Sequence, residues 1–413
     1  MPVSVAYTTT GLVLVEHEFQ LPLDHSRPDG EKITVFAREV ADPDGRDRPF
    51  LLFLQGGPGH EAARPIGSPR SPGWLDRALR DYRVLMLDQR GTGRSTPVDE
   101  LAGRTPQEQA DYLAHFRADA IVRDAELIRD ELGHQPWSVL GQSFGGFCAF
   151  TYLSHAPQGL REVFITGGVP PVGRHIDEVY RATYARTIAR VQRYYRRYPA
   201  DRDRVRELYE LLETKDVRLP DGDRLTGRRL RQLGSMLGMS YGADQLHYLL
   251  ELPVDSAAFR YDLLEAQAFA RNPLYTLLHE PCYGDGNNTR WSAQRTLPRD
   301  YERDVTLLTG EHSYPWMFED YGGLAPLKDA AGLLAARTWP RLYDPERLRN
   351  NEVPVAAAVY AEDLYVEAEF SMRAAAGVRN MRCWLTNEYD HNGLRADGSR
   401  ILSRLIDLTT GRA

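Results

Sequence analysis

A single serine set between two glycines is the feature that most constrains the fold of this chain. It lies in the stretch Leu-Gly-Gln-Ser-Phe-Gly-Gly-Phe, residues 140–147. The apolar run before it predicts a short buried strand, and the unbroken apolar spacing after it predicts a buried helix. A strand, Gly141-x-Ser143-x-Gly145 and a helix in succession are what a nucleophile elbow needs, because a side chain at either glycine would collide with the neighbouring strand or helix. Because this pattern is short, it also arises by chance. The rest of the chain must therefore support it.

Strand-like and helix-like segments alternate over the first 170 residues and return near the C-terminus. Helices are expected over 119–132, after the serine, and over 401–408. Apolar strands separated by helices indicate an α/β fold, with a mainly parallel sheet covered on both faces. The predicted strands are residues 35–40, 49–54, 82–87, 137–140, 162–166, 353–360 and 381–385.

The composition and periodicity of the sequence change after Pro170-Pro171. Residues 176–214 are rich in Arg, Tyr and Glu at helical spacing, and no sheet-like alternation follows until about residue 353. We therefore predict a core in two parts, residues 1–172 and 349–413, interrupted by a large and mostly helical cap over residues 173–348.

Composition excludes several classes of function. The net charge is −7 over 413 residues without a long block of one sign, which argues against a nucleic-acid partner. No apolar run approaches the ~18 residues of a membrane span. No Lys or Arg precedes Arg27, so we expect no secretory signal, which would begin with basic residues. The three cysteines lie far apart and form no C-x-x-C motif, which argues against disulfides and against a zinc site. This usage favours a reducing cytoplasm. We expect no metal and no cofactor, and the oligomeric state stays open.

A serine hydroxyl is a weak nucleophile that needs a base, and the base needs a third group to orient it. With Ser143 on an elbow, an acid and then a histidine should follow at the ends of late strands. Asp363 and His391 stand just past the two late strands in that order. Glu362 and Asp390 are rival acids, although Glu362 would face away and Asp390 adjoins the histidine too closely in sequence.

An acyl-transfer site also needs backbone N–H donors for its oxyanion. One donor should be Phe144, the residue after the nucleophile, and the other should come from the loop after an early strand. That loop reads Gln55-Gly-Gly-Pro-Gly59, and its glycines allow close approach to a ligand. We choose Gly57 as the second donor, and a cis bond to Pro58 is compatible with this turn.

A third glycine-rich loop, Asp88-Gln-Arg-Gly-Thr-Gly-Arg-Ser95, follows another strand. Phosphate binding is the alternative interpretation, but the third glycine of G-x-G-x-x-G and a Walker lysine are both absent. We therefore expect a structural turn in which buried Asp88 and Arg90 brace the loops around the serine.

These three loops together resemble the proline iminopeptidases (prolyl aminopeptidases) of the α/β-hydrolase superfamily, in the longer bacterial branch. Asp363-Leu-Tyr-Val366 and Asp390-His-Asn-Gly393 match as well, whereas many relatives carry His where this chain has Gln55. The resemblance implies an α/β-hydrolase fold and a metal-independent serine exopeptidase. Such an enzyme releases N-terminal proline from small peptides through an acyl-enzyme intermediate.

The resemblance also implies carboxylates near the cap that hold the substrate amine. The secondary ammonium of proline has two N–H donors, which two carboxylates can satisfy completely. Glu280 and Glu311 stand among aromatic and turn residues, so we predict that both hold the amine.

Two other functions stay open from the sequence. An esterase or amidase of the same fold would act on substrates without a free amine, because this fold hosts many chemistries. The other function is that of a non-catalytic ligand-binding protein on a hydrolase scaffold. The presence of Ser143, Asp363 and His391 together argues against it, because a binding protein needs no such set.

Overall fold

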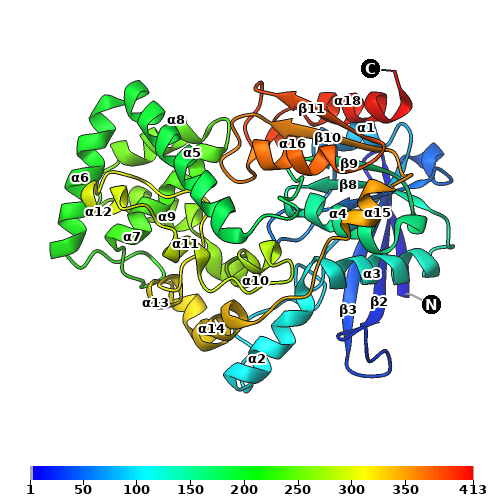
Figure 1. Cartoon of the computed structure of the whole chain (residues 1–413), viewed down its shortest axis with the longest axis horizontal. Coiled ribbons are helices and arrows are strands. Elements are labelled where there is room, and N and C mark those ends of the chain that lie inside the picture. Colours follow the sequence, from blue (N-terminus) through cyan, green and yellow to red (C-terminus); the bar gives the residue numbers. More distant parts are fainter. Residues whose placement is uncertain (1–2, 413) are drawn as a thin grey trace.

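The computed structural model describes residues 3–412. A nine-stranded sheet in the order β1-β2-β3-β7-β4-β8-β9-β10-β11 forms its centre, and β5 with β6 makes a small separate hairpin (Figure 1). The strands are β1 Val3–Thr9, β2 Leu12–Pro22, β3 Lys32–Ala41, β4 Phe50–Leu54, β5 Ile66–Gly67, β6 Arg70–Ser71, β7 Arg83–Leu87, β8 Trp137–Gln142, β9 Leu160–Thr166, β10 Val355–Tyr360 and β11 Met381–Thr386.

The six strands from β7 to β11 in this order are parallel, and β1, β2 and β3 add an antiparallel edge. All seven predicted strands are present, so the mainly parallel sheet is confirmed. The sequence reasoning missed β1 and β2. β1 carries Val3, Val5 and Tyr7 at alternate positions, a strand period that the sequence reasoning did not use, although every residue of β1 is exposed.

Helices cover both faces of the sheet, as predicted. On one face α1 and α18 pack over Leu51, Met86 and Leu140. On the other face α3 and α4 pack over Leu52 and Val139. The helices outside the β9–β10 connection are α1 Leu75–Ala78, α2 Pro106–Leu113, α3 Ala118–Glu131, α4 Phe144–His155, α16 Ala368–Ala376, α17 Gly393–Ala396 and α18 Gly398–Thr410.

The long connection between β9 and β10 is built from helices and contains no strand in the described chain. Most of it lies on the left of Figure 1, beyond the ends of β8 and β10, and its last helix returns to the side of α4. The predicted limits of a cap domain, residues 173–348, fall close to the start of α5 and the end of α15, and the division into domains stays a prediction. The helices are α5 Ile176–Arg197, α6 Pro199–Thr214, α7 Gly227–Arg231, α8 Gly242–Glu251, α9 Ala257–Ala266, α10 Pro273–Leu278, α11 Ser292–Arg295, α12 Asp300–Arg303, α13 Met317–Asp320, α14 Lys328–Ala336 and α15 Pro345–Arg349.

The longest helix, α5, has 22 residues and alternates buried aromatic positions with charged ones. Among residues 3–412, no helix combines the length and the apolar character that crossing a membrane requires.

Candidate active site

Ser143 occupies the turn between β8 and α4, with φ 54° and ψ −122°. Its N–H donates to the Thr166 carbonyl at 3.0 Å, which ties the turn to β9. A Cβ atom at Gly145 would lie 1.9 Å from the Leu54 carbonyl oxygen, and one at Gly141 would lie 2.4 Å from the Gly145 carbonyl oxygen. Because both obstacles are backbone atoms, only glycine fits either position, as the elbow pattern predicts.

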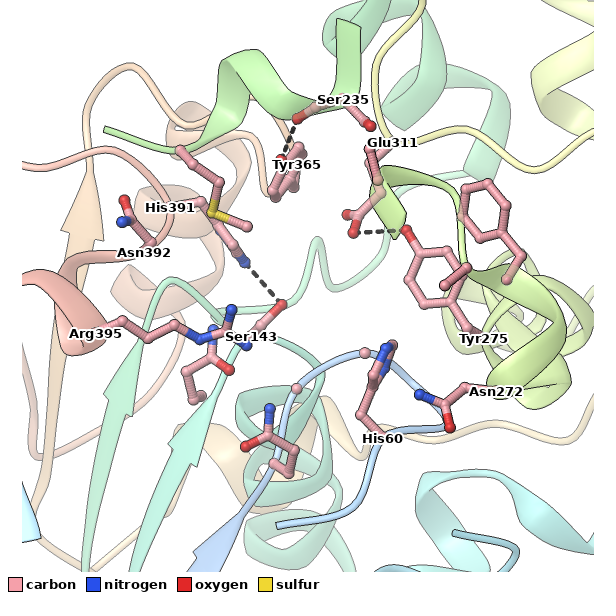
Figure 2. A pocket seen from close by; sticks show the side chains of 18 of the residues that line it. His60, Ser143, Ser235, Asn272, Tyr275, Glu311, Tyr365, His391, Asn392 and Arg395 are labelled. Carbon is pink, nitrogen blue, oxygen red and sulfur yellow. Dashed lines mark hydrogen bonds between the residues drawn. The ribbon is translucent and has the colours of Figure 1, made fainter. Parts of the chain in front are cut away.

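A continuous hydrogen-bonded chain joins the predicted serine, histidine and acid, and Figure 2 shows its link between His391 and Ser143. His391 Nε2 lies 2.9 Å from Ser143 Oγ, and His391 Nδ1 lies 2.7 Å from Asp363 Oδ2. All three residues are buried. The structure therefore brings together side chains that are separated by up to 248 residues in the sequence.

Asp363 is oriented by its own loop after β10. Its Oδ1 accepts the backbone N–H groups of Tyr365 at 2.8 Å and Val366 at 3.1 Å, which leaves Oδ2 for the histidine. The rival acids pair elsewhere: Glu362 binds Arg193, and Asp390 binds Arg190. Of the three carboxylates, Asp363 is therefore the one bonded to His391.

The electrostatics around His391 favour its cationic form. Burial acts to lower the pKa of this imidazole, but the charge and hydrogen bond of Asp363 outweigh burial, so the pKa lies above its ordinary value of 6.5. The carboxylate of Glu311 adds to the rise. A base that is stabilised once it has taken a proton suits the deprotonation of a serine hydroxyl.

The glycine loop after β4 lies directly against the nucleophile. A Cβ at Gly56 would stand 2.9 Å from the Ser143 Cβ, and both Gly56 and Gly57 line the same cavity as Ser143. Gly57 has φ 129° and its peptide bond to Pro58 is cis, as the sequence allowed. Phe144 is the first residue of α4, so its N–H has no helical carbonyl to bind. Both predicted oxyanion donors thus flank the serine, and their role stays a prediction.

A cavity of about 460 Å³ opens above Ser143 between the sheet and the helical connection. Glu311 lines it, and one carboxylate oxygen accepts the Tyr275 hydroxyl at 2.8 Å while the other lies 3.6 Å from His279 Nε2. Burial acts to raise the pKa of Glu311, but His279 and His391 outweigh it and hold the pKa below its ordinary value. Glu311 therefore presents a negative charge inside the cavity.

Glu280 does not line this cavity. Its side chain is buried, one oxygen accepts the Ala293 N–H at 2.8 Å at the start of α11, and the other has no partner in the described chain. Burial raises its pKa to about 7. Of the two predicted glutamates, only Glu311 lines the cavity, because Glu280 packs behind the cavity wall. A direct contact between Glu280 and the substrate amine stays a prediction.

The sequence reasoning missed most of the cavity wall. Several lining side chains come from the helical connection, where no motif marked them, and from the segments that follow the glycine loop and His391. The sequence carries no local signal for them, because their position depends on how distant helices pack. The missed lining residues include His60, Glu265, Phe269, Tyr275 and Arg395.

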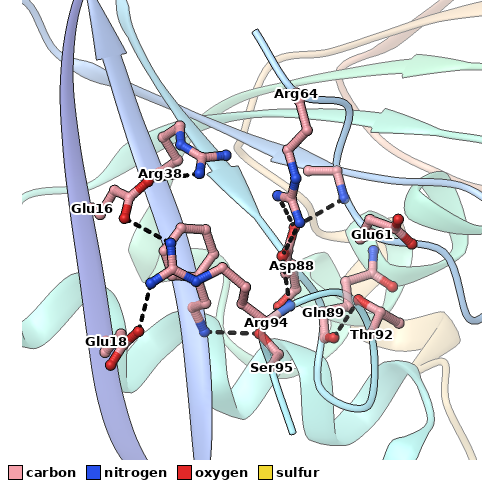
Figure 3. A network of polar contacts seen from close by, with 12 residues as sticks. Glu16, Glu18, Arg38, Glu61, Arg64, Asp88, Gln89, Thr92, Arg94 and Ser95 are labelled. Carbon is pink, nitrogen blue, oxygen red and sulfur yellow. Dashed lines mark hydrogen bonds and ion pairs between the residues drawn. The ribbon is translucent and has the colours of Figure 1, made fainter. Parts of the chain in front are cut away.

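The loop 88–95 is a structural brace, as predicted, although Asp88 and Arg90 bind different partners. Asp88 is fully buried and accepts both Arg64 guanidinium N–H groups at 2.9 Å, together with the backbone N–H groups of Ala62 and Arg94 (Figure 3). Arg90 is also buried and pairs with Asp124 on α3. The brace therefore fixes the segment after the glycine loop.

This arrangement can carry out acyl transfer. It has a nucleophile in hydrogen-bond contact with a base, an acid that orients the base, and N–H groups beside the nucleophile for a developing oxyanion. Among the described residues, no cluster of His, Cys, Asp and Glu has the geometry of a metal site.

Known proteins resemble this chain along most of its length. A family model described as alpha/beta hydrolase fold matches residues 49–393. Proline iminopeptidase of Aeromonas sobria is 49% identical, over 97% of this chain and 98% of that protein. Proline iminopeptidase aneH of Aspergillus aculeatus is 37% identical, over 96% of this chain and 94% of that protein. A solved proline iminopeptidase from Mycobacterium smegmatis matches 96% of this chain and 100% of that one at 14% identity, with a TM-score of 0.46 that is too low to carry an argument.

The predicted fold class and the resemblance stated from the sequence are both confirmed. The chain belongs to the proline iminopeptidase family of α/β hydrolases.

Proposed function

We propose that this protein is a serine exopeptidase that releases proline from the N-terminus of small peptides. One observation supports it most: a single cavity holds the Ser143 hydroxyl bonded to His391 and, facing it, the carboxylate of Glu311. A nucleophile and a fixed negative charge in one cavity suit a substrate whose scissile carbonyl lies close to a free amine.

In the proposed reaction Ser143 Oγ attacks the carbonyl of the N-terminal proline while His391 Nε2 takes its proton. The imidazolium, stabilised by Asp363, then protonates the leaving amine and the acyl-enzyme forms. Gly57 and Phe144 N–H groups hold the oxyanion in both steps. Water, deprotonated by His391, releases proline and restores the serine.

The wall around Glu311 supports an exopeptidase rather than an endopeptidase. The Phe269 and Tyr275 rings line the cavity and stack with centroids 5.8 Å apart, which offers an apolar slot for a pyrrolidine ring. Tyr180 and His279, both buried, fill the space behind the carboxylate. We expect this packing to exclude a residue before the proline.

Hydrolysis of matched aryl amides tests the proposal. Proline, N-acetyl-proline and alanine amides and a simple aryl ester are compared for the wild type and Ser143→Ala. The free proline amide should be cleaved, the acetylated one should not, and Ser143→Ala should be inactive. If only the ester reacts, or if acetylation has no effect, the protein is another hydrolase of this fold; if an organophosphate fails to label Ser143, it is a binding protein.

Glutamine substitutions then assign the amine site. Glu311→Gln should raise KM for the proline amide about 10–100-fold, since a charge-assisted hydrogen bond contributes about 1.5–3 kcal/mol. Ester hydrolysis should change much less. Glu210→Gln, an exposed position on α6, is the charge-matched control. A loss at Glu280→Gln equal to that at Glu311→Gln would show that Glu280 also reaches the amine.

We also propose a cytoplasmic location. The support is compositional: Cys148, Cys282 and Cys383 are all free thiols, as a reducing compartment favours. Fractionation of cells that express the native protein tests it, and recovery outside the cytoplasmic fraction would contradict it.

A further inference from the structure

A second cavity, of about 330 Å³, adjoins the one at Ser143. The two share part of their walls, so a molecule bound at the serine can extend from one into the other. The second cavity lies on the side of the glycine loop and α17, and neither Glu311 nor Tyr275 lines it. The shared lining residues are Gln55, His60, Gln142, Arg271 and Arg395.

Three arginines line the second cavity, and two of them are already neutralised. Arg64 forms a two-pronged ion pair with buried Asp88, and Arg271 pairs with Glu61. The guanidinium of Arg395 has neither a hydrogen bond nor an ion pair with any other residue in the range 3–412. It is therefore the cation of this wall whose charge is available to a ligand.

Arg395 stands on the opposite side of the nucleophile from Glu311. In Figure 2 its side chain reaches into the cavity from α17, and Ser143 lies between it and the Glu311 carboxylate. Its charge is felt by the neighbouring imidazole: burial lowers the pKa of His60, and Arg395 lowers it further. One end of the site is thus negative and the other positive, with the nucleophile between them.

A peptide cleaved after its first residue has matching charges at its two ends. With its ammonium at Glu311 and its first carbonyl at Ser143, the remaining chain points towards Arg395. One residue spans about 3.5 Å, so the free carboxylate of a dipeptide or tripeptide stays close to the serine, whereas that of a longer peptide moves beyond the wall. The planar guanidinium binds a carboxylate with two parallel hydrogen bonds.

We propose that Arg395 binds the C-terminal carboxylate of the substrate, so that this protein prefers dipeptides and tripeptides with a free C-terminus. The inference rests on the proposed function and specifies the leaving-group side of the same site. Arg395 is then a specificity-determining residue, and its contribution depends on the substrate's carboxylate rather than on the chemistry at Ser143.

The experiment compares Pro-Gly with Pro-Gly amide, and with Pro-Gly-Gly-Gly-Gly, for the wild type, Arg395→Gln and Arg395→Lys. The wild type should prefer Pro-Gly to its amide about tenfold in kcat/KM, mainly through KM. Arg395→Gln should reduce that ratio to about one, and Arg395→Lys should restore part of it. High salt should weaken the preference, because the guanidinium is exposed.

Arg404→Gln on α18 is the matched control, because it removes the same charge from an exposed arginine that lines neither cavity. It should keep the tenfold ratio. A wild type that cleaves Pro-Gly and Pro-Gly amide equally well overturns the inference and leaves the proposed function standing. The same conclusion follows if Arg395→Gln keeps the wild-type ratio of kcat/KM for Pro-Gly to kcat/KM for Pro-Gly amide. If no proline substrate is cleaved at all, the proposed function fails and the inference fails with it.

Discussion

Ser143 holds a backbone conformation that side chains rarely adopt, with φ 54° and ψ −122°. Such residues carry strain of about 1–3 kcal/mol, which the surrounding structure must offset. We expect Ser143→Gly to be more stable than Ser143→Ala by about 1 kcal/mol, because glycine relieves the strain but loses ~0.5–1 kcal/mol in chain entropy. Urea denaturation of the two inactive variants measures the difference. Equal stability, or a more stable alanine variant, would show that the elbow stores no strain.

The pH dependence at the same site follows from His391. Its pKa lies above 6.5, since Asp363 outweighs the effect of burial, and the base must be neutral to accept the serine proton. We expect kcat/KM to fall as pH drops through a value above 6.5. Asp363→Asn removes the charge that holds this pKa up, so the acid limb should move to lower pH while the plateau falls about 10³–10⁴-fold. If the acid limb of the kcat/KM profile does not move in Asp363→Asn, a group other than His391 controls the loss of activity at low pH.

The glycines of the elbow constrain an element rather than a single side chain. A methyl group at Gly145 would meet the Leu54 carbonyl, which belongs to β4, so α4 would have to move away from the sheet. We expect Gly145→Ala to destabilise the fold by about 3 kcal/mol or more, or to be insoluble. Gly332→Ala in α14 is the control: its Cβ would meet nothing within 4 Å, so it should stabilise by about 0.5–1 kcal/mol. Thermal unfolding distinguishes the two, and a harmless Gly145→Ala would contradict the packing.

Glu280 is a buried acceptor at the start of α11, with its pKa raised from 4.5 to about 7 by burial. The folded state therefore keeps a proton that the unfolded state releases between these pH values, so this group lowers stability as pH rises. At 1.36 kcal/mol per pKa unit, the loss between pH 5 and pH 8 is about 2–3 kcal/mol. Glu280→Gln should abolish that part of the pH dependence. Chemical denaturation at both pH values measures it, and an unchanged slope would contradict a raised pKa of the buried Glu280 carboxyl.

At the scale of the whole molecule, α5 clamps the loops that carry the site. Arg190 donates to the Glu362 carbonyl at 3.0 Å and to Asp390 at 2.7 Å, next to the acid and the histidine respectively. Arg186, one turn earlier, binds Glu367 and the Ala361 carbonyl. The helical connection thus positions the loops of Asp363 and His391 and also lines the cavity at Ser143.

Arg190→Ala should therefore lower kcat about tenfold for every substrate alike, proline amide and aryl ester included, because it loosens both loops at once. Arg190→Lys should recover part of the loss. Arg181→Ala, an exposed position on the same helix, is the control and should retain wild-type rates. An effect confined to KM for amine-bearing substrates would place Arg190 at the substrate instead.

The parts of the site that could be predicted are those with a local signature. Gly141, Ser143 and Gly145 follow from the sterics of one turn, and Asp363 and His391 follow from their places after strands in a fixed order. Glu280 shows the limit of this reasoning: its sequence context is as suitable as that of Glu311, yet it bonds to α11 behind the wall. The strand β1 was also missed, although Val3, Val5 and Tyr7 stand at the period of a strand.

The sequence by itself determined the strands of the parallel sheet and the order of nucleophile, acid and base, because apolar periodicity and the need for glycine act between neighbouring residues. Only the tertiary structure decided which glutamate faces the serine and which arginine keeps a free charge. Those outcomes depend on contacts between distant segments, such as the pairing of Arg271 with Glu61 across 210 residues. Burial and charge neutralisation are properties of the packed molecule, and no short stretch of sequence contains them.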